Sequence, residues 1–191
     1  SEITAGYKAS LVPGGFGRLV DLTGGMGVDF AALSPRVEQS VYVEQDQGLC
    51  HIARHNFSVL GLQGISVVND PGEAFLQRME PAEMIYLDPS RRDNVGRKVV
   101  RIEECSPDVS VIREQLLAKA KLVVIKFSPM LDISLALKSL GRVSEVHVVS
   151  VENECKELLF LLSPDAMATL FHAVNLYRTG KMERFYFSPE E

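Results

Sequence analysis

Short apolar runs alternate with amphipathic stretches along most of the chain, and this alternation predicts its secondary structure. The apolar runs predict strands at 18–22, 40–44, 65–69, 84–88 and 122–127. The amphipathic stretches predict helices at 28–34, 47–60, 72–79, 108–120 and 133–140. Because strands and helices take turns along the chain, we expect a doubly wound α/β fold with helices on both faces of a mostly parallel sheet.

The alternation changes after Gly141. The runs 143–151 and 156–162 both have the pattern of strands, and only a short polar turn joins them. Such a turn cannot hold a crossover helix, so we expect these two strands to be antiparallel. The pattern therefore predicts a seven-stranded, mostly parallel sheet with one antiparallel strand, in a domain at 1–163.

Residues 164–191 are expected to extend this domain. The runs 169–176 and 184–187 predict a further hairpin there. The chain starts without a methionine and ends on polar residues, so we expect it to be part of a longer protein with flanking domains.

Composition and charge exclude several classes of protein. The chain has 191 residues, 46% of them hydrophobic and 24% charged, which fits one domain with a full core. Its apolar runs are shorter than the roughly 18 residues that a membrane span needs, so we expect no membrane association. The net charge of −5 argues against a general polyanion binder, so any contact with nucleic acid would need a local basic patch.

The cysteines and histidines do not predict a metal site or disulfides. Cys50, Cys105 and Cys155 are odd in number and form no CxxC pair, which indicates reduced thiols and a cytoplasmic location. His51 and His55 lie one helical turn apart beside Cys50, but a fourth ligand is not evident. We expect these side chains to belong to a helix surface.

The most informative stretch joins the first predicted strand to the first predicted helix. It reads DLTGGMG and begins at Asp21. A glycine-rich turn of this kind lets backbone N–H groups approach a nucleotide-like ligand closely. Asp21 is suited to hold the amino group of a methionine moiety, and Thr23 offers a hydroxyl. Gly25 and Gly27, with Gly24 beside them, would keep side chains out of the way of the ligand.

Acidic residues close four of the predicted strands: Asp21, Glu44, Asp70 and Asp88. In open α/β sheets, ligands bind at the carboxyl ends of the strands. Glu44 has two acceptor oxygens that suit the two hydroxyls of a ribose. Asp70 suits the adenine amino group, and it also suits the N-cap of the helix that begins near Pro71, so both roles stay open. Asp46 is expected to cap the helix at 47–60.

A nicotinamide cofactor would use a similar turn followed by an acid. Its G-x-G-x-x-G fingerprint needs a final Gly or Ala, because the helix packs closely on the strand there. Counted from Gly25, that position holds Phe30. The pattern therefore favours S-adenosylmethionine (SAM) as the cofactor.

These residues resemble the motifs of class I, Rossmann-like SAM-dependent methyltransferases that modify RNA or DNA bases. The DLTGGMG stretch is similar to their first motif, D-x-F-x-G-x-G, with Thr23 in place of the usual aromatic or glycine. The match continues through Glu44, Asp70 and Asp88, over about two-thirds of the chain. It is closest to RNA guanine methyltransferases, including trimethylguanosine synthases, and to bacterial THUMP-like methyltransferase proteins with a D-P-[AS]-R-R-D motif. In those relatives an extra domain often follows the catalytic one.

The resemblance implies an acceptor site at the end of the fourth strand. In base N-methyltransferases this strand ends in D/N-P-P-Y/F, where the acid and the next carbonyl accept hydrogen bonds from the target amino group. Asp88 and Pro89 match that motif, whereas Ser90 replaces the second proline and Arg91 replaces the aromatic residue. An arginine can still stack on a base or hold a phosphate. We therefore expect these four residues to position a nitrogen of an RNA base for methyl transfer.

A basic cluster follows this motif: Arg91, Arg92, Arg97, Lys98 and Arg101. Arg91 and Arg92 are expected to clamp a substrate phosphate, although acids nearby also fit a solvated loop. Lys126, near the end of the strand at 122–127, is the third expected substrate-binding residue, and a simple rim turn is the alternative there.

Three functions stay open on this pattern. The first is a methyltransferase acting on RNA. The second is a methyltransferase for a small molecule or a protein, in which the basic cluster would grip an acidic substrate. The third is a SAM-binding module without catalysis, because Ser90 and Arg91 depart from the motif.

Overall fold

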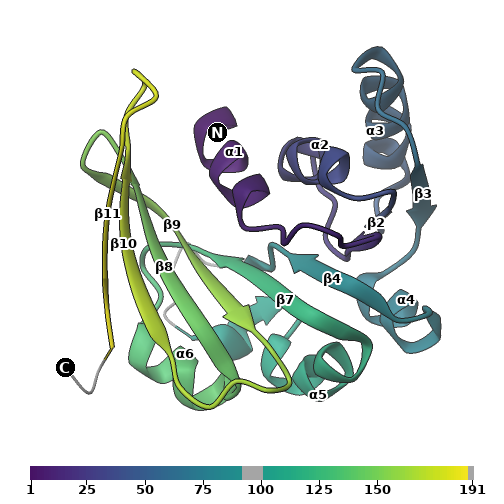
Figure 1. Ribbon diagram of the computed structural model, residues 1–191. Helices are drawn as coiled ribbons and strands as arrows, with labels where there is room; N and C mark the ends of the chain where they lie inside the picture. Colours follow the sequence, from purple (N-terminus) through teal and green to yellow (C-terminus); the bar gives the residue numbers. More distant parts are fainter. Residues whose placement is uncertain (92–100, 189–191) are drawn as a thin grey trace. The chain divides into compact units, whose positions relative to one another are not determined.

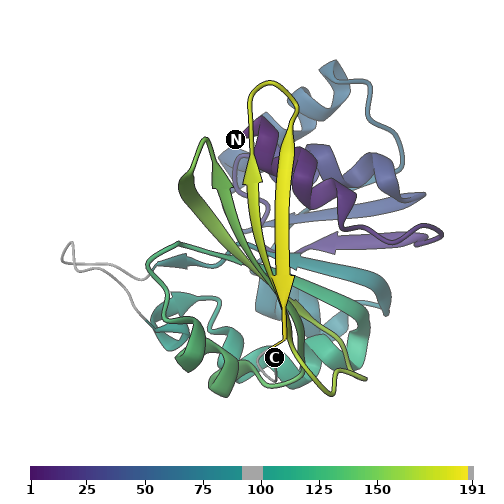
Figure 2. The same ribbon diagram turned by 60° about the vertical axis from the view of Figure 1, so that its left-hand side comes forward.

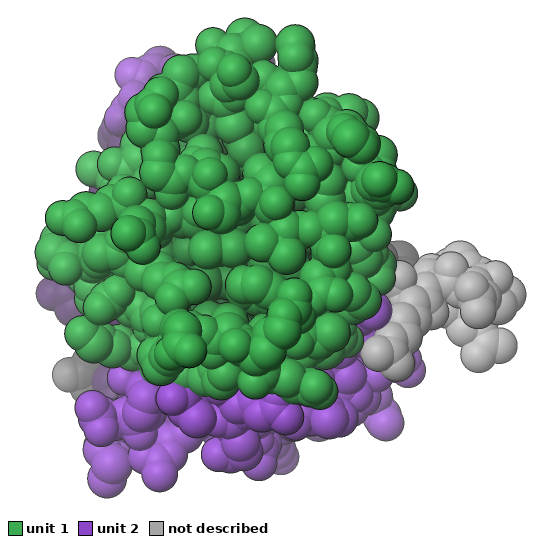
Figure 3. Space-filling view, turned by 90° about the vertical axis from the view of Figure 1, so that its right-hand side faces the viewer, with its two compact units in different colours: residues 1–87, 119–121 green, residues 88–118, 122–191 purple. Residues whose placement is uncertain are grey.

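The computed structural model describes residues 1–91 and 101–188, which form two compact units (Figure 3). The first unit holds Ser1–Leu87 with Lys119–Lys121, and the second holds Asp88–Ala118 with Leu122–Glu191. The chain passes from the first unit to the second at the end of its fourth strand.

The first unit is a parallel sheet with helical crossovers (Figure 1). Its strands lie in the order β4-β1-β2-β3, and each neighbouring pair is parallel. The elements in chain order are α1 (Glu2–Ser10), β1 (Arg18–Asp21), α2 (Val28–Leu33), η1 (Ser34–Arg36), β2 (Gln39–Glu44), α3 (Gln47–Val59), β3 (Ile65–Asn69), α4 (Gly72–Arg78) and β4 (Ala82–Leu87).

The second unit contains a mixed sheet in the order β11-β10-β8-β9-β7 (Figure 2). Strand β9 is antiparallel to both β7 and β8, β10 is parallel to β8, and β11 is antiparallel to β10. The elements in chain order are β5 (Ser90–Arg91), η2 (Ile102–Glu104), β6 (Cys105–Ser106), α5 (Val109–Lys119), β7 (Ala120–Phe127), α6 (Ile133–Leu140), β8 (Val143–Val151), β9 (Glu154–Leu162), β10 (Leu170–Leu176) and β11 (Met182–Phe187). The last residue of α5 and the first two of β7 belong to the first unit.

These elements confirm the predicted α/β class and most of the predicted boundaries. The antiparallel pairing of β8 with β9 and the hairpin of β10 with β11 are both confirmed. The expected number of seven strands is wrong, because within the described residues the first unit's sheet has four strands and the second unit's mixed sheet has five. The extra pair arises because β10 pairs along β8, so β11 becomes a second antiparallel strand. Hydrophobic alternation predicts a hairpin but does not say which strand it will join.

Three aromatic rings connect the helices and the sheet of the first unit. Phe30 of α2 and Phe57 of α3 both pack on Tyr42 of β2, with ring centroids 5.5 Å apart in each case. All three rings are almost fully buried. Buried aromatic clusters of this kind supply a large apolar area and a defined geometry. They place α2 and α3 on β2, directly beneath the turn that follows β1.

Within the described part of the chain, none of the helices combines the length and the apolar character that crossing a membrane requires.

Candidate functional site

The turn between β1 and α2 is anchored on the neighbouring strand. The Gly24 N–H donates to the carbonyl of Val43 at 2.9 Å, and the Gly27 N–H donates to the carbonyl of Gly24 at 2.9 Å. Gly25 and Gly27 have positive φ angles of 54° and 75°, a region that side chains other than glycine rarely adopt. The sequence therefore needs glycine at these two positions to turn the chain from the strand into the helix.

The glycines of this turn are required for different reasons. A Cβ on Gly24 would meet the ring of Tyr42 at 2.3 Å, and one on Gly27 would meet the ring of Phe57 at 2.9 Å. A Cβ on Gly25 would meet only the carbonyl oxygen of Thr23, at 3.6 Å. A side chain on Gly27 would therefore collide with the aromatic core, and the role of Gly27 in making room for a ligand stays a prediction. Of these three glycines, Gly25 alone has room for a Cβ at an ordinary contact distance.

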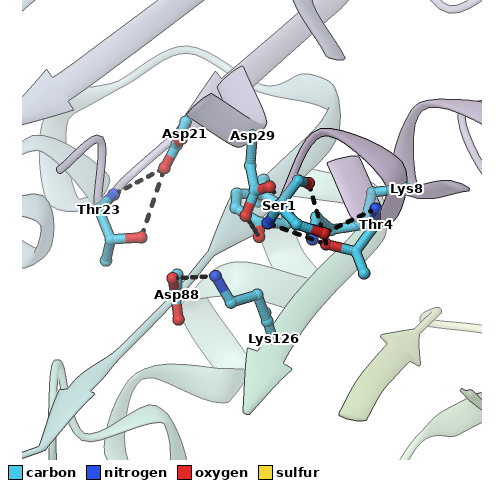
Figure 4. A network of polar contacts seen from close by, with 9 residues as sticks. Ser1, Thr4, Lys8, Asp21, Thr23, Asp29, Asp88 and Lys126 are labelled. Atoms are coloured by element: carbon cyan, nitrogen blue, oxygen red, sulfur yellow. Dashed lines mark hydrogen bonds and ion pairs between the residues drawn. The ribbon is translucent and has the colours of Figure 1, made fainter. Parts of the chain in front are cut away.

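The carboxylate of Asp21 shapes the start of the turn. Its Oδ1 accepts the Thr23 N–H at 2.9 Å and lies 3.4 Å from the Thr23 hydroxyl (Figure 4). The residue is 2% exposed. Burial of an acid is tolerated when it is hydrogen-bonded in this way. Asp21 and Thr23, both predicted site residues, are thus brought together at the carboxyl end of β1.

Glu44 joins the end of β2 to the same turn. One carboxylate oxygen accepts the Gly25 N–H at 2.8 Å, and the other accepts the Asp46 N–H at 2.8 Å. Hydrogen bonds to a charged carboxylate are stronger than neutral ones. The two oxygens offer about four lone-pair sites, of which these bonds use two, so the group keeps acceptor capacity for a ligand. The sequence predicted Glu44 as a site residue but not its bond to Gly25.

The Tyr42 hydroxyl completes the support of the turn. It donates to the carbonyl of Gly25 at 2.5 Å. Burial, together with the nearby carboxylate of Glu44, raises the pKa of Tyr42 far above its ordinary value. The hydroxyl therefore stays protonated and acts as a donor at any physiological pH.

Asp70 follows β3 and pairs with the guanidinium of Arg78. The predicted N-cap role of Asp70 is wrong, because α4 begins one residue later and its N-cap is Pro71, which has no side-chain cap bond. The cap predicted for Asp46 is confirmed, since its carboxylate accepts the Leu49 N–H at 3.0 Å.

Asn69, which the sequence did not indicate, ties β3 to β2. Its amide donates to the carbonyls of Glu44 and Gln45, each at 2.9 Å. The Asp70 N–H also donates to the Glu44 carbonyl, at 3.1 Å. These bonds hold the carboxyl ends of β2 and β3 together.

In the second unit, the acid that follows β4 forms an ion pair. Lys126 Nζ, near the end of β7, lies 2.5 Å from Asp88 Oδ2 (Figure 4). Both side chains are partly exposed, at 25% and 41%. The sequence assigned the two residues to separate roles, and the structure places them together as one charge pair.

This pair lines a cavity of about 340 Å³. The polar and charged groups around it are Asp88, Ser90, Cys105, Lys126, Ser128 and Lys156. Sequence reasoning missed Cys105 and Lys156 as lining residues. Cys105 belongs to β6, a two-residue strand that pairs with β5, and so short a strand leaves no periodic signal in the sequence.

The predicted phosphate clamp stays a prediction. The side chain of Arg91 and the whole of Arg92, Arg97 and Lys98 lie outside the described residues.

The residues at the start of α3 do not converge on one point. Cys50 is buried and donates to the carbonyl of Glu44 at 3.3 Å, whereas His51 and His55 are exposed. Burial raises the pKa of the Cys50 thiol, which keeps it protonated. It is therefore an inert core residue of the helix.

A cluster that the sequence did not indicate lies on β8, β10 and β11. Glu145 Oε2 lies 2.9 Å from Nε2 of His147 and 2.9 Å from Nε2 of His172. The guanidinium of Arg184 donates to Nδ1 of His172 at 2.8 and 3.1 Å. If Nε2 of His172 bound a metal ion, Nδ1 of the same ring would carry the proton. That N–H would then point at the N–H groups of Arg184, donor against donor. The geometry therefore favours a charge cluster over a metal centre.

Comparison with known proteins places this chain in a family. The sequence model described as Conserved hypothetical protein 95 matches residues 9–151. An uncharacterized S-adenosylmethionine-dependent methyltransferase of Mycobacterium tuberculosis is 27% identical over 142 residues, which are 74% of this chain and 37% of that protein.

Solved structures show the same fold. A crystal structure from Porphyromonas gingivalis W83, named as a candidate methyltransferase, matches with a TM-score of 0.86 and 32% identity. The match covers 100% of this chain and 48% of that one. An rRNA methylase from Streptococcus thermophilus matches with a TM-score of 0.58 and 16% identity, over 84% of this chain and 94% of that one. The chain spans only about a third to a half of the first two proteins.

The family model covers most of the chain, and the glycine turn with its acidic strand ends agrees with the SAM-dependent class of the M. tuberculosis relative. The chain thus belongs to the Conserved hypothetical protein 95 family.

Proposed function

We propose that this chain binds SAM at the strand ends of its first unit and methylates a nitrogen of an RNA base held at Asp88. The observation that carries the proposal is the Glu44 carboxylate, which bonds to the Gly25 N–H of the glycine turn at 2.8 Å. It puts a carboxylate that could accept hydrogen bonds from ribose hydroxyls beside the one glycine of the turn where a Cβ would meet no atom closer than 3.6 Å.

The carboxylates and the glycine turn of the first unit suit the parts of SAM. Asp21 offers a carboxylate to the ammonium of the methionine moiety, with Thr23 beside it. Gly24, Gly25 and Gly27 keep the turn compact. Glu44 has acceptor capacity for the ribose hydroxyls, and Asp70 follows the next strand, where the adenine amino group would lie.

The second unit supplies the acceptor residues. When bound, SAM supplies an activated methyl group on a sulfonium, so the chain needs to position a nucleophile and little more. Asp88 and the carbonyl of Pro89 accept hydrogen bonds from the target N–H groups and orient the nitrogen lone pair. Lys126 offsets the charge of Asp88 across 2.5 Å, and Ser90 borders the same cavity. Arg91 and Arg92 are proposed to hold phosphate.

RNA as the substrate rests on the resemblance of the sequence motifs, and the S. thermophilus neighbour has the fold of this class. A second candidate is an acidic small molecule or protein. The observation that favours it is the pair Lys126 and Lys156 at the cavity.

We also propose that residues 164–191 extend the domain at 1–163 and lead into a further domain. The support for this is that the chain covers 48% of the P. gingivalis protein.

Asp88→Ala tests the acceptor site. We expect methyl transfer from labelled SAM to an RNA pool to be abolished, while the dissociation constant for S-adenosylhomocysteine (SAH) stays within about twofold. Asp165→Ala is the control, because Asp165 is an exposed acid of the same unit. Unchanged turnover in Asp88→Ala would refute the role of this residue, and labelling of a protein or a small molecule instead of RNA would favour the second candidate.

A further inference from the structure

Two tyrosines flank Asp21 in the sheet of the first unit. Asp21 is in register with Tyr42 of β2 on one side and with Tyr86 of β4 on the other. Residues in register on neighbouring strands point to the same face of the sheet. The Tyr42 hydroxyl donates to the carbonyl of Gly25 at 2.5 Å, and the Tyr86 hydroxyl donates to Asp29 Oδ2 at 2.7 Å. One tyrosine thus holds the glycine turn and the other holds the first turn of α2.

The second oxygen of Asp29 is bound by a lysine from α1. Lys8 Nζ lies 3.1 Å from Asp29 Oδ1, and the Lys8 side chain is only 1% exposed (Figure 4). The Asp29 side chain is 13% exposed. A buried ammonium is costly unless it is paired, so the ion pair strongly favours this one arrangement of α1 and α2.

The helix that carries Lys8 is itself fixed at its start. Ser1 and Thr4 form a capping box, in which each side chain bonds to the backbone of the other residue. Ala5 and Tyr7 are buried with Lys8. Helix α1 therefore presents the ammonium from a capped helix.

The position of this network connects it to the turn. Asp29 lies two residues after Gly27, where the glycine turn becomes helix, and the Leu22 N–H donates to the carbonyl of Tyr86 at 3.0 Å. The network therefore holds the turn from the β4 side, just as Tyr42 and Glu44 hold it from the β2 side. Replacing a buried ion pair by apolar side chains of similar size often leaves the free energy of unfolding unchanged, so stability alone does not call for a buried Lys8–Asp29 pair.

We propose that Lys8 is a positioning residue for the cofactor, which acts through Asp29 and Tyr86 to keep the glycine turn in the conformation that receives the amino-acid end of SAM. This rests on the proposed location of SAM at that turn. Lys8 is too deeply buried to serve as a direct contact, so its effect should be confined to the part of the ligand that the turn holds.

The test compares two ligands that differ in this part. SAH carries the amino acid, whereas 5′-methylthioadenosine has the same adenosine and sulfur but lacks the amino acid. In Lys8→Met we expect the dissociation constant for SAH to rise by about tenfold or more, and that for methylthioadenosine to change by less than about twofold. Lys8→Arg keeps the charge and should restore most of the SAH affinity. Both constants are measured by isothermal titration calorimetry on the whole chain.

Tyr86→Phe is the second variant, because it removes one hydroxyl and keeps the buried ring. We expect the same selective loss of SAH binding, by about threefold to tenfold. Added to Lys8→Met it should cost little more, since both act through Asp29. Lys121→Met is the matched control, because Lys121 is 73% exposed and pairs with Glu83 in the same unit.

Equal weakening of both ligands in Lys8→Met would assign the residue a purely structural role and overturn the proposal. Unchanged binding of both ligands would overturn it as well. If the unaltered chain binds SAH no more tightly than methylthioadenosine, the amino acid adds no affinity. The positioning proposal then fails, and the adenosine site stands. If it binds neither ligand, the proposed cofactor site itself is wrong.

Discussion

At the scale of single residues, the glycine turn shows how a sequence motif and its physical reason can differ. The sequence identified the glycines as residues that make room for a ligand. In the structure Gly24 and Gly27 pack against Tyr42 and Phe57, and only Gly25 has room for a Cβ at an ordinary contact distance. A motif can therefore mark residues that must be glycine, although the side chains that leave no room for a Cβ lie outside the motif.

Gly24→Ala should destabilise the first unit by about 1–3 kcal/mol, because the new methyl group would overlap the buried Tyr42 ring, 2.3 Å away. Urea unfolding measures the change in the free energy of unfolding. Gly14→Ala is the control, since a Cβ there meets nothing within 4 Å. Equal effects of the two substitutions would show that the ring moves aside.

Lys126→Met should separate catalysis from stability. The pair with Asp88 is partly exposed, so its loss should change the free energy of unfolding by less than about 1 kcal/mol. Turnover should nevertheless fall by about tenfold or more, because Asp88, the acid proposed to orient the acceptor, loses its partner. Lys126→Arg should retain most of kcat. Steady-state kinetics with SAM as the varied substrate measures this, and an unchanged kcat in Lys126→Met would remove Lys126 from the acceptor site.

At the scale of elements, the cluster of Glu145, His147, His172 and Arg184 joins three strands of the second unit. The His147 and His172 rings stack at 4.3 Å, across the parallel pairing of β8 with β10. The hydrogen bond from His147 lowers the pKa of Glu145, and burial lowers the pKa of His172. We therefore expect the stability of these three joined strands to depend on pH.

Acid should destabilise the second unit through both groups. The unfolded state takes up protons at a higher pH than the folded state does, near 6.5 for His172 and near 4.5 for Glu145. The stability they contribute is therefore present above these values and is lost as the pH falls below them. We expect the midpoint of thermal unfolding to fall between pH 7 and pH 5, and to fall less steeply in His172→Gln. His55→Gln, at an exposed histidine of α3, serves as the control. Equal slopes in all three proteins would show that His172 does not couple folding to protons.

At the scale of the whole molecule, the proposed binding of SAM makes a direct prediction about ligands. SAH at about 100 times its dissociation constant should stabilise the chain by about 2.7 kcal/mol, which raises the melting midpoint by roughly 5–10 °C. NAD should give no shift, because Phe30 occupies the position where a dinucleotide site needs a small residue. A shift with NAD alone would contradict the cofactor assignment.

The sequence by itself determined the α/β class, the boundaries of β1, β2 and β3 and their crossovers to within about two residues, and the acids at the strand ends. These features follow from local periodicity and from short motifs, which the sequence displays directly. Only the tertiary structure decided that β10 would pair with β8, that Lys126 would meet Asp88, and that Lys8 would bury its charge against Asp29. Each of these contacts joins positions that are distant in the chain. They depend on strand register and on how helices pack, and local periodicity does not encode these.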